Sequence, residues 1–491
     1  MLRTFFVLGC GWLAVVGAGR AGAQTPSADL ATIQRAVVEA IARAEKSVVA
    51  IARVQRERPG QRAPLEPRPD PFGNRRAAVL PPPRPTDPDF IPDDLAVGVV
   101  IERGGLVLTA AHVLAEESDY YVTAARRPAF QAKVLAADPR SDLAVLAPIE
   151  GPVAGSGEWV PMALGNADAL QKGEFVVALG NPYAIRREGQ PSASWGVVAN
   201  LARKAPPTPD EEDPIGKSTL HHFGTLIETD ARLNMDSSGS PLINLKGEMV
   251  GMATAIPSVV GFQASAGYAI PVDATFRRAL DALRQGREVE YGFLGIQLGG
   301  AGRSDAGGAT PGTRVERVIP GLPAARHGLK SGDVILAVNG VAVRDSDELV
   351  RQLSKYPLET AVKLALRRGD RQLDLEVPLT KLRVRGRRVV TAEDPPWRGL
   401  RVDYATAVQE VYSTAANFPL GEALAVTEVE KDSPAWEAGL RPGSLITHVE
   451  RSPVRTPKQF RQAVAAKTGP VSIRVVGEGG ESAERTIRDG K

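Results

Sequence analysis

The nine residues NMDSSGSPL, Asn234 to Leu242, decide the fold of this chain. Small residues around Ser238 predict a tight turn, and the apolar run that follows, Leu242–Leu245, predicts a strand. A serine in such a turn is a candidate nucleophile, because a backbone of small residues can aim N–H groups at an oxyanion. Each such group contributes about 3 kcal/mol to transition-state stabilisation. The backbone N–H groups of Asp236, Ser237 and Ser238 are the candidates here.

A serine nucleophile needs a histidine base and a buried carboxylate that orients the imidazole. The chain has five histidines, so the choice is small. His112 follows the strand-like run Leu106–Thr109, and Asp142 opens another apolar strand, Leu143–Leu146. The order His112, Asp142, Ser238 is informative, because the same chemistry on other folds runs Asp-His-Ser or Ser-Asp-His.

His221 and His222 form the other notable group of histidines. Neighbouring residues on a strand face opposite ways, and no cysteine or carboxylate cluster accompanies this pair. We therefore assign the two histidines to a loop and predict no metal site. The sequence also contains no phosphate-binding P-loop, so no cofactor is expected.

Length and composition set the broad class. With 491 residues the chain exceeds the roughly 250–300 residues of a single core, which predicts two to four domains. It is 43% hydrophobic and 24% charged, as in a soluble globular protein, and its formal net charge is only +3. Nothing in this balance favours nucleic acid as a partner.

The N-terminus has the layout of a secretory signal peptide. A basic residue, Arg3, precedes the apolar run Phe5–Val16, and Ala21-Gly22-Ala23 forms an A-x-A cleavage site. We expect residues 1–23 to be removed. The alternative, an uncleaved anchor helix, is less favoured because the run is shorter than the ~20 residues of a bilayer span. Cys10 is the only cysteine and lies in this run, so the mature chain would contain no disulfide.

The rest of the chain divides into three parts. Apolar residues at three- and four-residue steps predict a helix over Leu30–Ala44. Eleven prolines in residues 57–93 predict a loop without regular pairing, inserted between two strand-like runs. Short strand-like runs with turn signals continue to Val272, which is typical of an antiparallel barrel or sandwich.

The C-terminal third contains an internal repeat with an offset of 111 residues. Glycines, prolines and apolar residues coincide over roughly forty positions, which indicates a duplicated small domain. The matching pairs include Val315 and Val426, Pro323 and Pro434, Gly328 and Gly439, Ile335 and Ile446, and Leu349 and Phe460.

Taken together, these features resemble the HtrA/Deg family of serine proteases. The resemblance covers nearly the whole mature chain, and its strength lies in the order of the motifs, since any one alone would be weak. The matching motifs are Thr109-Ala110-Ala111-His112, Asp138-Pro139-Arg140-Ser141-Asp142, Leu164-Gly165-Asn166, Gly180-Asn181-Pro182, Ser238-Gly239-Ser240-Pro241-Leu242 and Ala266-Gly267-Tyr268-Ala269-Ile270-Pro271.

The resemblance implies a mainly β fold. A chymotrypsin-like double β-barrel over residues 24–285, with 57–93 as its long loop, would be followed by α+β PDZ domains at 290–382 and 395–491. It also implies an ATP-independent endopeptidase of the periplasm with His112, Asp142 and Ser238 as its triad. The enzyme would be a homotrimer or a multiple of one and would act on unfolded or damaged proteins.

PDZ domains bind peptide carboxyl termini in a loop of N–H groups beside an edge strand. In the first domain the resemblance assigns this loop to Phe293, Leu294, Gly295 and Ile296, with a helix over Asp345–Ser354 lining the groove. In the second it assigns Leu400, Arg401 and Val402, with Arg401 in the place of the glycine.

Two departures bear on activity and specificity. Asp236 stands where the family has glycine, so its carboxylate could oppose an oxyanion, and the chain could instead be a catalytically weak chaperone or PDZ adaptor. Arg232, six residues before Ser238, replaces the acid that a preference for basic residues would need. Leu233 and Ile270 suggest, by family analogy, an apolar pocket for Val, Ala or Ile.

Overall fold

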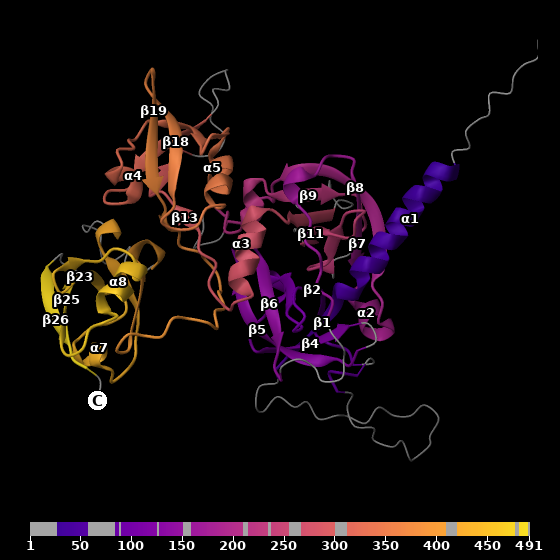
Figure 1. The fold of residues 1–491 in the computed structure, drawn as a ribbon, viewed down its shortest axis with the longest axis horizontal. Helices are drawn as coiled ribbons and strands as arrows, with labels where there is room; N and C mark the ends of the chain where they lie inside the picture. The colour runs from indigo at the N-terminus through magenta and orange to yellow at the C-terminus, as the bar shows by residue number, and fades with distance from the viewer. Residues whose placement is uncertain are drawn as a thin grey trace, which may run out of the picture.

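The structure is a computed structural model, and its described residues are 27–56, 84–87, 90–124, 127–150, 159–209, 215–233, 237–254, 267–299, 312–408, 420–476 and 481–489. The predicted signal peptide, residues 1–23, and most of the proline-rich segment 57–93 lie outside them. Figure 1 shows a large body built from two barrels and, beside it, two smaller modules. No helix within the described ranges is both long and apolar enough to span a bilayer.

The first barrel is closed and has the strand order β1-β2-β3-β6-β5-β4. Alternation of buried and half-buried residues along β4 is the pattern expected of a strand with one face in a core. Its strands are β1 (Val48–Gln55), β2 (Asp94–Val100), β3 (Val107–Ala110), β4 (Ser118–Ala124), β5 (Phe130–Asp138) and β6 (Leu143–Pro148).

The second barrel is also closed, with the order β10-β11-β12-β9-β8-β7. Two closed six-stranded barrels confirm the predicted chymotrypsin-like architecture. The strands are β7 (Phe175–Gly180), β8 (Ser192–Arg203), β9 (Leu226–Thr229), β10 (Pro241–Ile243), β11 (Met249–Ala253) and β12 (Gly267–Pro271).

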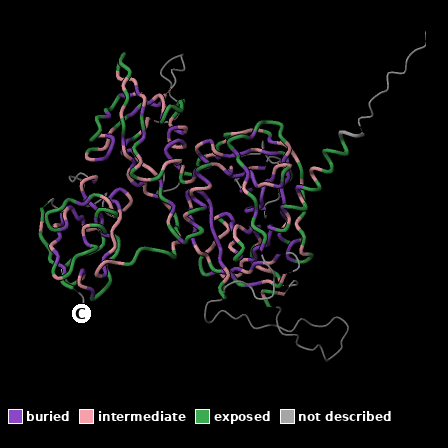
Figure 2. The backbone as a smooth tube through the Cα atoms, in the orientation of Figure 1, coloured by how far each residue is buried: buried purple, intermediate pink, exposed green. Residues whose placement is uncertain are grey.

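Helices cover the outside of the barrels. They are α1 (Ser27–Ala44), α2 (Pro182–Glu188) and α3 (Ala274–Leu283), with 3-10 turns η1 (Glu45–Ser47), η2 (Ala111–Val113), η3 (Ala167–Ala169) and η4 (Leu220–Phe223). The largest apolar cluster draws on both barrels, α1 and α3, whereas two smaller clusters each draw on the strands and loops of one barrel. The buried backbone in Figure 2 follows the barrel strands. The barrels therefore share one core, which fixes how they lie against each other.

The first C-terminal module, Gly292–Lys381, is an antiparallel sheet with two short helices. Its sheet has the order β14-β15-β16-β18-β19, and β14 is therefore an edge strand. The elements are β13 (Gly292–Phe293), β14 (Ile296–Leu298), β15 (Thr313–Val318), α4 (Pro323–Arg326), β16 (Val334–Val338), β17 (Val341–Ala342), α5 (Ser346–Leu353), β18 (Ala361–Arg368), β19 (Arg371–Pro378) and β20 (Thr380–Lys381).

The second C-terminal module, Leu400–Ile487, repeats this arrangement with the sheet order β21-β22-β23-β25-β26. Helices α7 and α8 begin and end 111 residues after α4 and α5, which confirms the duplication. The elements are β21 (Leu400–Tyr404), η6 (Ala405–Ala407), η7 (Leu420–Glu422), β22 (Leu424–Val429), α7 (Pro434–Glu437), β23 (Leu445–Val449), β24 (Ser452–Pro453), α8 (Pro457–Val464), β25 (Val471–Val476) and β26 (Ser482–Ile487).

Ion pairs and hydrogen bonds join the three parts. The buried ammonium of Lys381 lies 2.8 Å from Glu288, which follows the second barrel, and 2.6 Å from Asp403 of the second module. The hydroxyl of Tyr291 donates to Asp138 of the first barrel over 2.5 Å. Both Tyr291 and Asp138 are buried. The first module is thus connected to the barrel body and to the second module at once.

Candidate active site

His112 and Asp142 lie together because β3 and β6 are paired strands. His112 lies in η2, directly after β3, and Asp142 immediately precedes β6 with a left-handed φ of 58°. That conformation turns the Asp142 backbone so that its carbonyl accepts from Ala111 and its carboxylate accepts from the N–H of His112 at 2.9 Å. The Nδ1 atom of His112 is 2.8 Å from Oδ2 of Asp142. Asp142 therefore holds His112 through both its backbone N–H and its imidazole.

Ser238 reaches the same histidine from the second barrel. It lies in the turn before β10, and its Oγ is 2.9 Å from Nε2 of His112. The turn is held against β2, where the N–H of Val97 donates to the carbonyl of Ser238 at 3.0 Å. Gly239 makes this approach feasible, because its φ is +88° and an added Cβ would lie 2.0 Å from the Val97 carbonyl oxygen. The sequence-predicted residues His112, Asp142 and Ser238 thus form one hydrogen-bonded chain.

The charges of this chain are set by burial and hydrogen bonding. Burial alone would raise the pKa of Asp142, but hydrogen bonds from His112 and His221 hold it well below its usual range. Burial alone would lower the pKa of His112, but Asp142 raises it above its ordinary value. Asp142 is therefore an anion at neutral pH, and it favours the protonated form that His112 takes on accepting a proton.

The predicted oxyanion and specificity residues are only partly described. Asp236 lies outside the described residues, while Ser237 and Ser238 are buried beside Gly239. The N–H of Arg232 donates to Ser194 Oγ at 2.8 Å, and the Arg232 side chain is exposed.

The two apolar residues expected to line the pocket pack in different places. Leu233 lies against Gly267 at the start of β12 and adjoins the apolar cluster of the second barrel. Ile270 is buried in the cluster shared by both barrels. The structure therefore does not bring Leu233 and Ile270 into one apolar cluster.

In the first module the residues Phe293–Ile296 connect β13 to the edge strand β14. Gly295 has a φ of +86°, and an added Cβ would lie 2.3 Å from Leu322. The carbonyl of Gly295 accepts from Ile319 and that of Leu294 from Ala324, each at 2.9 Å. The Phe293 side chain packs against the apolar cluster between the two modules.

The second module has the same loop, two residues earlier than the sequence suggested. The carbonyl of Gly399 accepts from Glu430 at 2.8 Å, and Glu430 is the repeat counterpart of Ile319. Gly399 also has a positive φ, +79°, so it and not Arg401 corresponds to Gly295. Assigning Arg401 to the glycine position was wrong, because the carbonyl before Gly399, that of Arg398, accepts from Ala435 just as that of Leu294 accepts from Ala324 in the first module.

The residues Leu400, Arg401 and Val402 consequently form the start of the edge strand β21. Leu400 is buried, and Arg401 lies opposite Glu428 in β22, 3.0 Å from its carboxylate. The same edge strand is attached to the first module, since Asp403 binds Lys381 and the Tyr404 hydroxyl donates to Glu359 at 2.8 Å.

Comparison with known proteins agrees with this architecture. Residues 96–252 match the trypsin-like peptidase domain, and residues 292–379 and 425–476 each match a PDZ domain. The chain is 30% identical over 399 residues to the "Periplasmic pH-dependent serine endoprotease DegQ" of Escherichia coli, and the match covers 79% of this chain and 79% of that protein. The chain belongs to the HtrA/Deg family of serine endopeptidases.

Two further proteins are similar to this chain. The "Putative serine protease HhoA" of Synechocystis sp. is 33% identical over 301 residues, which cover 58% of this chain and 70% of that protein. The solved structure "HtrA-type protease AlgW with tripeptide" is 23% identical, with a TM-score of 0.49, and the match covers 70% of this chain and 96% of that one. From here on we call the first and second C-terminal modules PDZ1 and PDZ2.

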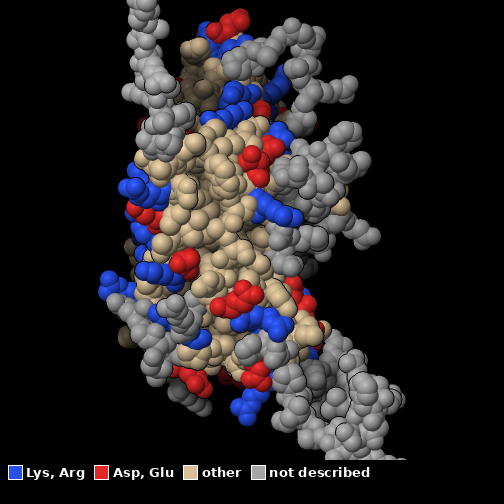
Figure 3. All heavy atoms as spheres, turned by 90° about the vertical axis from the view of Figure 1, so that its right-hand side faces the viewer, with Lys and Arg blue, Asp and Glu red and all other residues tan. Residues whose placement is uncertain are grey.

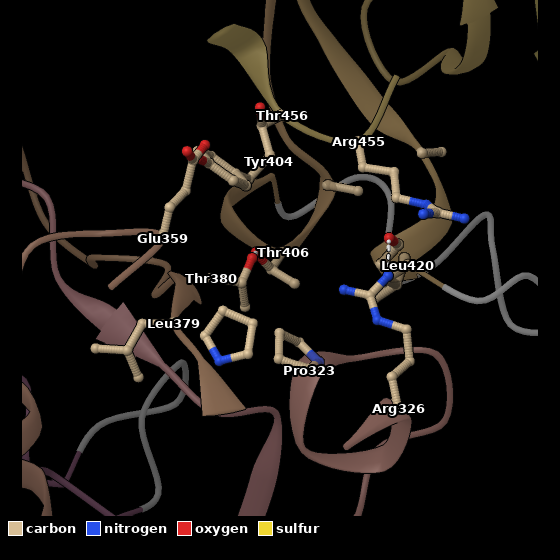
Figure 4. Close-up of a pocket in the computed structure, with 14 residues that line it drawn as sticks. Pro323, Arg326, Glu359, Leu379, Thr380, Tyr404, Thr406, Leu420, Arg455 and Thr456 are labelled. Carbon is tan, nitrogen blue, oxygen red and sulfur yellow. Dashed lines mark hydrogen bonds between the residues drawn. The ribbon is translucent and has the colours of Figure 1, made fainter. Parts of the chain in front are cut away.

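A cavity of about 120 Å³ lies between PDZ1 and PDZ2 (Figure 4), and no triad residue lines it. Pro323 and Arg326 of PDZ1 face Leu420 and Arg455 of PDZ2 across it. Arg326 and Arg455 each pair with Glu422. The cavity is therefore part of the contact between the modules, and its charged side chains are already paired within the chain.

Sequence reasoning did not identify one residue of the site, His221. Its Nε2 lies 3.4 Å from Oδ2 of Asp142, the same oxygen that His112 contacts. The assignment of His221 and His222 to a loop was wrong, since both lie in η4 and are buried. Among the described residues no group of three or more His, Cys, Asp and Glu side chains could hold a metal ion.

Proposed function

We propose that this HtrA/Deg chain hydrolyses peptide bonds of unfolded or damaged proteins in the periplasm without ATP, using Ser238, His112 and Asp142. The observation that carries the proposal is the pair of contacts at His112, 2.9 Å to Ser238 Oγ and 2.8 Å to Asp142 Oδ2. Such a chain is what activation of a serine hydroxyl requires.

The chemistry follows from these contacts. As Ser238 Oγ attacks the scissile carbonyl, its proton passes to Nε2 of His112, and the ionised Asp142 stabilises the resulting imidazolium. His112 then delivers this proton to the leaving amine, which frees one product and leaves an ester on Ser238. Water attacks the ester, His112 accepts its proton and returns it to Ser238, and the second product leaves as an acid.

Backbone N–H groups would stabilise the two tetrahedral intermediates. We assign this role to Ser238 and Asp236 with Ser237 between them, because a turn of small residues exposes its N–H groups. Asp236 is the residue that could weaken this site. For the primary pocket, Arg232 argues against cleavage after lysine or arginine, since a basic side chain there would be repelled.

PDZ1 and PDZ2 would bind exposed carboxyl termini of substrates. In PDZ1 support comes from the loop around Gly295 and from β14. Because β14 is an edge strand that pairs with β15 on one side only, a substrate peptide could add as a strand on its other side. In PDZ2, β21 is also an edge strand, but its residues Asp403 and Tyr404 already bind Lys381 and Glu359 of PDZ1. We therefore assign substrate capture mainly to PDZ1.

We further propose an oligomer of identical chains, a trimer or a multiple of one. The face that carries α1 shows a broad band of uncharged side chains bordered by charged ones (Figure 3). On α1 the apolar side chains of Leu30 and Val38 are 65% and 57% exposed. Exposed apolar surface of this kind marks contact sites between proteins.

The test compares wild type with Ser238→Ala on casein and on a fluorophosphonate probe that labels activated serines. We expect wild type to cleave and to be labelled, and the variant to do neither. Ser240→Ala is the matched control, because Ser240 lies in the same turn and its buried Oγ has no hydrogen-bond partner among the described residues. Absence of both turnover and labelling in wild type would reject the protease and leave the chaperone or adaptor.

A further inference from the structure

The triad carboxylate has a second histidine neighbour. Oδ2 of Asp142 accepts from His112 at 2.8 Å and from the hydroxyl of Thr254 at 3.0 Å, and Nε2 of His221 lies 3.4 Å from the same oxygen. The side chains of His221 and Asp142 are each only 8% exposed. The imidazole of His221 therefore contacts the catalytic carboxylate at a site that is largely shielded from solvent.

The contacts of His221 define its tautomer. Its Nδ1 is buried and has no hydrogen-bond partner among the described residues. A proton on Nδ1 would leave a buried donor unsatisfied and would point the Nε2 lone pair at an anion, which is unfavourable twice. The neutral form with its proton on Nε2 avoids both costs and donates to Asp142. This assignment follows from the network of contacts.

The fold holds His221 at this position from several sides. The carbonyl of His221 accepts from Ala205 at 2.8 Å, and the N–H of Leu220 donates to the carbonyl of Arg140, two residues before Asp142. Helix α5 of PDZ1 packs against η4. Its buried Asp347 pairs with Lys217 at 2.7 Å and Lys204 at 2.6 Å, and both lysines belong to the segment that leads to η4.

We propose that His221 is a positioning residue of the active site, whose Nε2–H holds the Asp142 carboxylate in place and moderates the basicity that Asp142 confers on His112. The inference rests on the proposed function, since it assumes the triad. Without this donor the carboxylate would concentrate its charge on His112. The imidazolium would then be favoured more strongly, and its proton would be lost at higher pH.

The charged and titratable groups around His221 come from the first barrel, from its own segment and from helix α5. Asp142 and His112 face it from the first barrel, and Arg140 lies in the loop before Asp142. His222 and Lys217 lie on its own segment, and Lys204 and Asp347 face that segment across the contact with α5. Only Asp142 among them is within hydrogen-bond reach of the imidazole in the described structure.

The experiment replaces His221 and, as the matched control, His222. Both are buried in η4, but the polar contact of His222 is to the carbonyl of Ala205 and does not reach the triad. We expect His221→Ala to lower kcat/KM about tenfold, the effect of one hydrogen bond to a charged group. The acid limb of its pH profile should move upward by roughly half a pH unit. His221→Gln keeps an N–H donor and should restore most of both values.

A second readout does not depend on turnover. In a Ser238→Ala background the pKa of His112 can be followed by NMR, since the chain has only five histidines. An upward shift in His221→Ala, absent in His222→Ala, supports the inference. An unchanged pKa, or equal changes in both variants, overturns it and indicates a packing role. Loss of the proposed function would appear separately, as a wild type that neither cleaves nor labels.

Discussion

Substitution of Gly239 by alanine tests whether the nucleophile turn depends on its close approach to β2. Gly239 has a φ of +88°, and an added Cβ would lie 2.0 Å from the carbonyl oxygen of Val97 and 2.6 Å from Oγ1 of Thr109. Gly173 supplies the control within the same protease domain. Its φ is +89°, and an added Cβ would meet nothing within 4 Å. The two substitutions share the backbone cost and differ only in the collision.

The magnitudes follow from these distances. An alanine in the left-handed region costs roughly 1–2 kcal/mol, which is the whole expectation for Gly173→Ala. In Gly239→Ala the turn must also move by about 1 Å, because a carbonyl oxygen 2.0 Å from a Cβ cannot remain there. That movement breaks the hydrogen bond from Val97 to Ser238 and leaves buried groups unsatisfied, which adds about 1–3 kcal/mol.

Two measurements decide the outcome. Denaturant unfolding should show a larger loss of stability for Gly239→Ala than for Gly173→Ala. Fluorophosphonate labelling of Ser238 should fall by about 10²-fold in Gly239→Ala, the scale of a 1 Å misplacement, and stay within a few-fold of wild type in the control. Equal unfolding costs together with equal labelling rates would refute the idea that this contact positions Ser238.

Two further predictions concern titrating groups. Burial alone would lower the pKa of His112, but Asp142 raises it above the ordinary value of 6.5. Because His112 must be neutral to accept a proton, kcat/KM should rise with pH through a midpoint above 6.5. Asp142→Asn should lower that midpoint. Burial alone would raise the pKa of Asp347, but its ion pairs with Lys204 and Lys217 lower it. These ion pairs therefore stabilise the fold fully at pH values above the ordinary pKa of an aspartate. Their contribution is lost as the pH falls through the lowered pKa of Asp347. Asp347→Asn should therefore destabilise the chain by about 1–3 kcal/mol at neutral pH, the scale of a hydrogen bond to a charged group, and by less in acid. Denaturant unfolding at both pH values measures the difference.

The sequence was sufficient for the parts of the site that lie in local motifs. His112, Asp142 and Ser238 each follow or precede a recognisable strand, and the small residues of the turn around Ser238 indicate what it does. The duplication and its 111-residue offset were likewise readable from repeated glycines, prolines and apolar residues. The strand pattern alone left a barrel or a sandwich open, and the two closed barrels were expected only from the family resemblance.

What the sequence could not show depends on tertiary contact. His221 is separated from Asp142 by 79 positions, and no spacing rule connects a histidine of a 3-10 turn with that carboxylate. The second peptide-binding loop was misplaced for a different reason. Arg401 stood beside a plausible run of residues, and only the positive φ of Gly399 and its bond from Glu430 identify the true counterpart of Gly295.

The segment Asp138–Asp142 is held at both ends by contacts that reach PDZ1. At its first residue, Asp138 accepts from Tyr291, which directly precedes β13 of PDZ1. At its last residue, Asp142 has the contact to His221, whose turn packs on α5. Helix α5 is also the helix expected to line the peptide groove of PDZ1. The loop that carries the triad carboxylate is therefore in contact with η4, which packs on α5, through His221, and with the residue that precedes β13 through Tyr291.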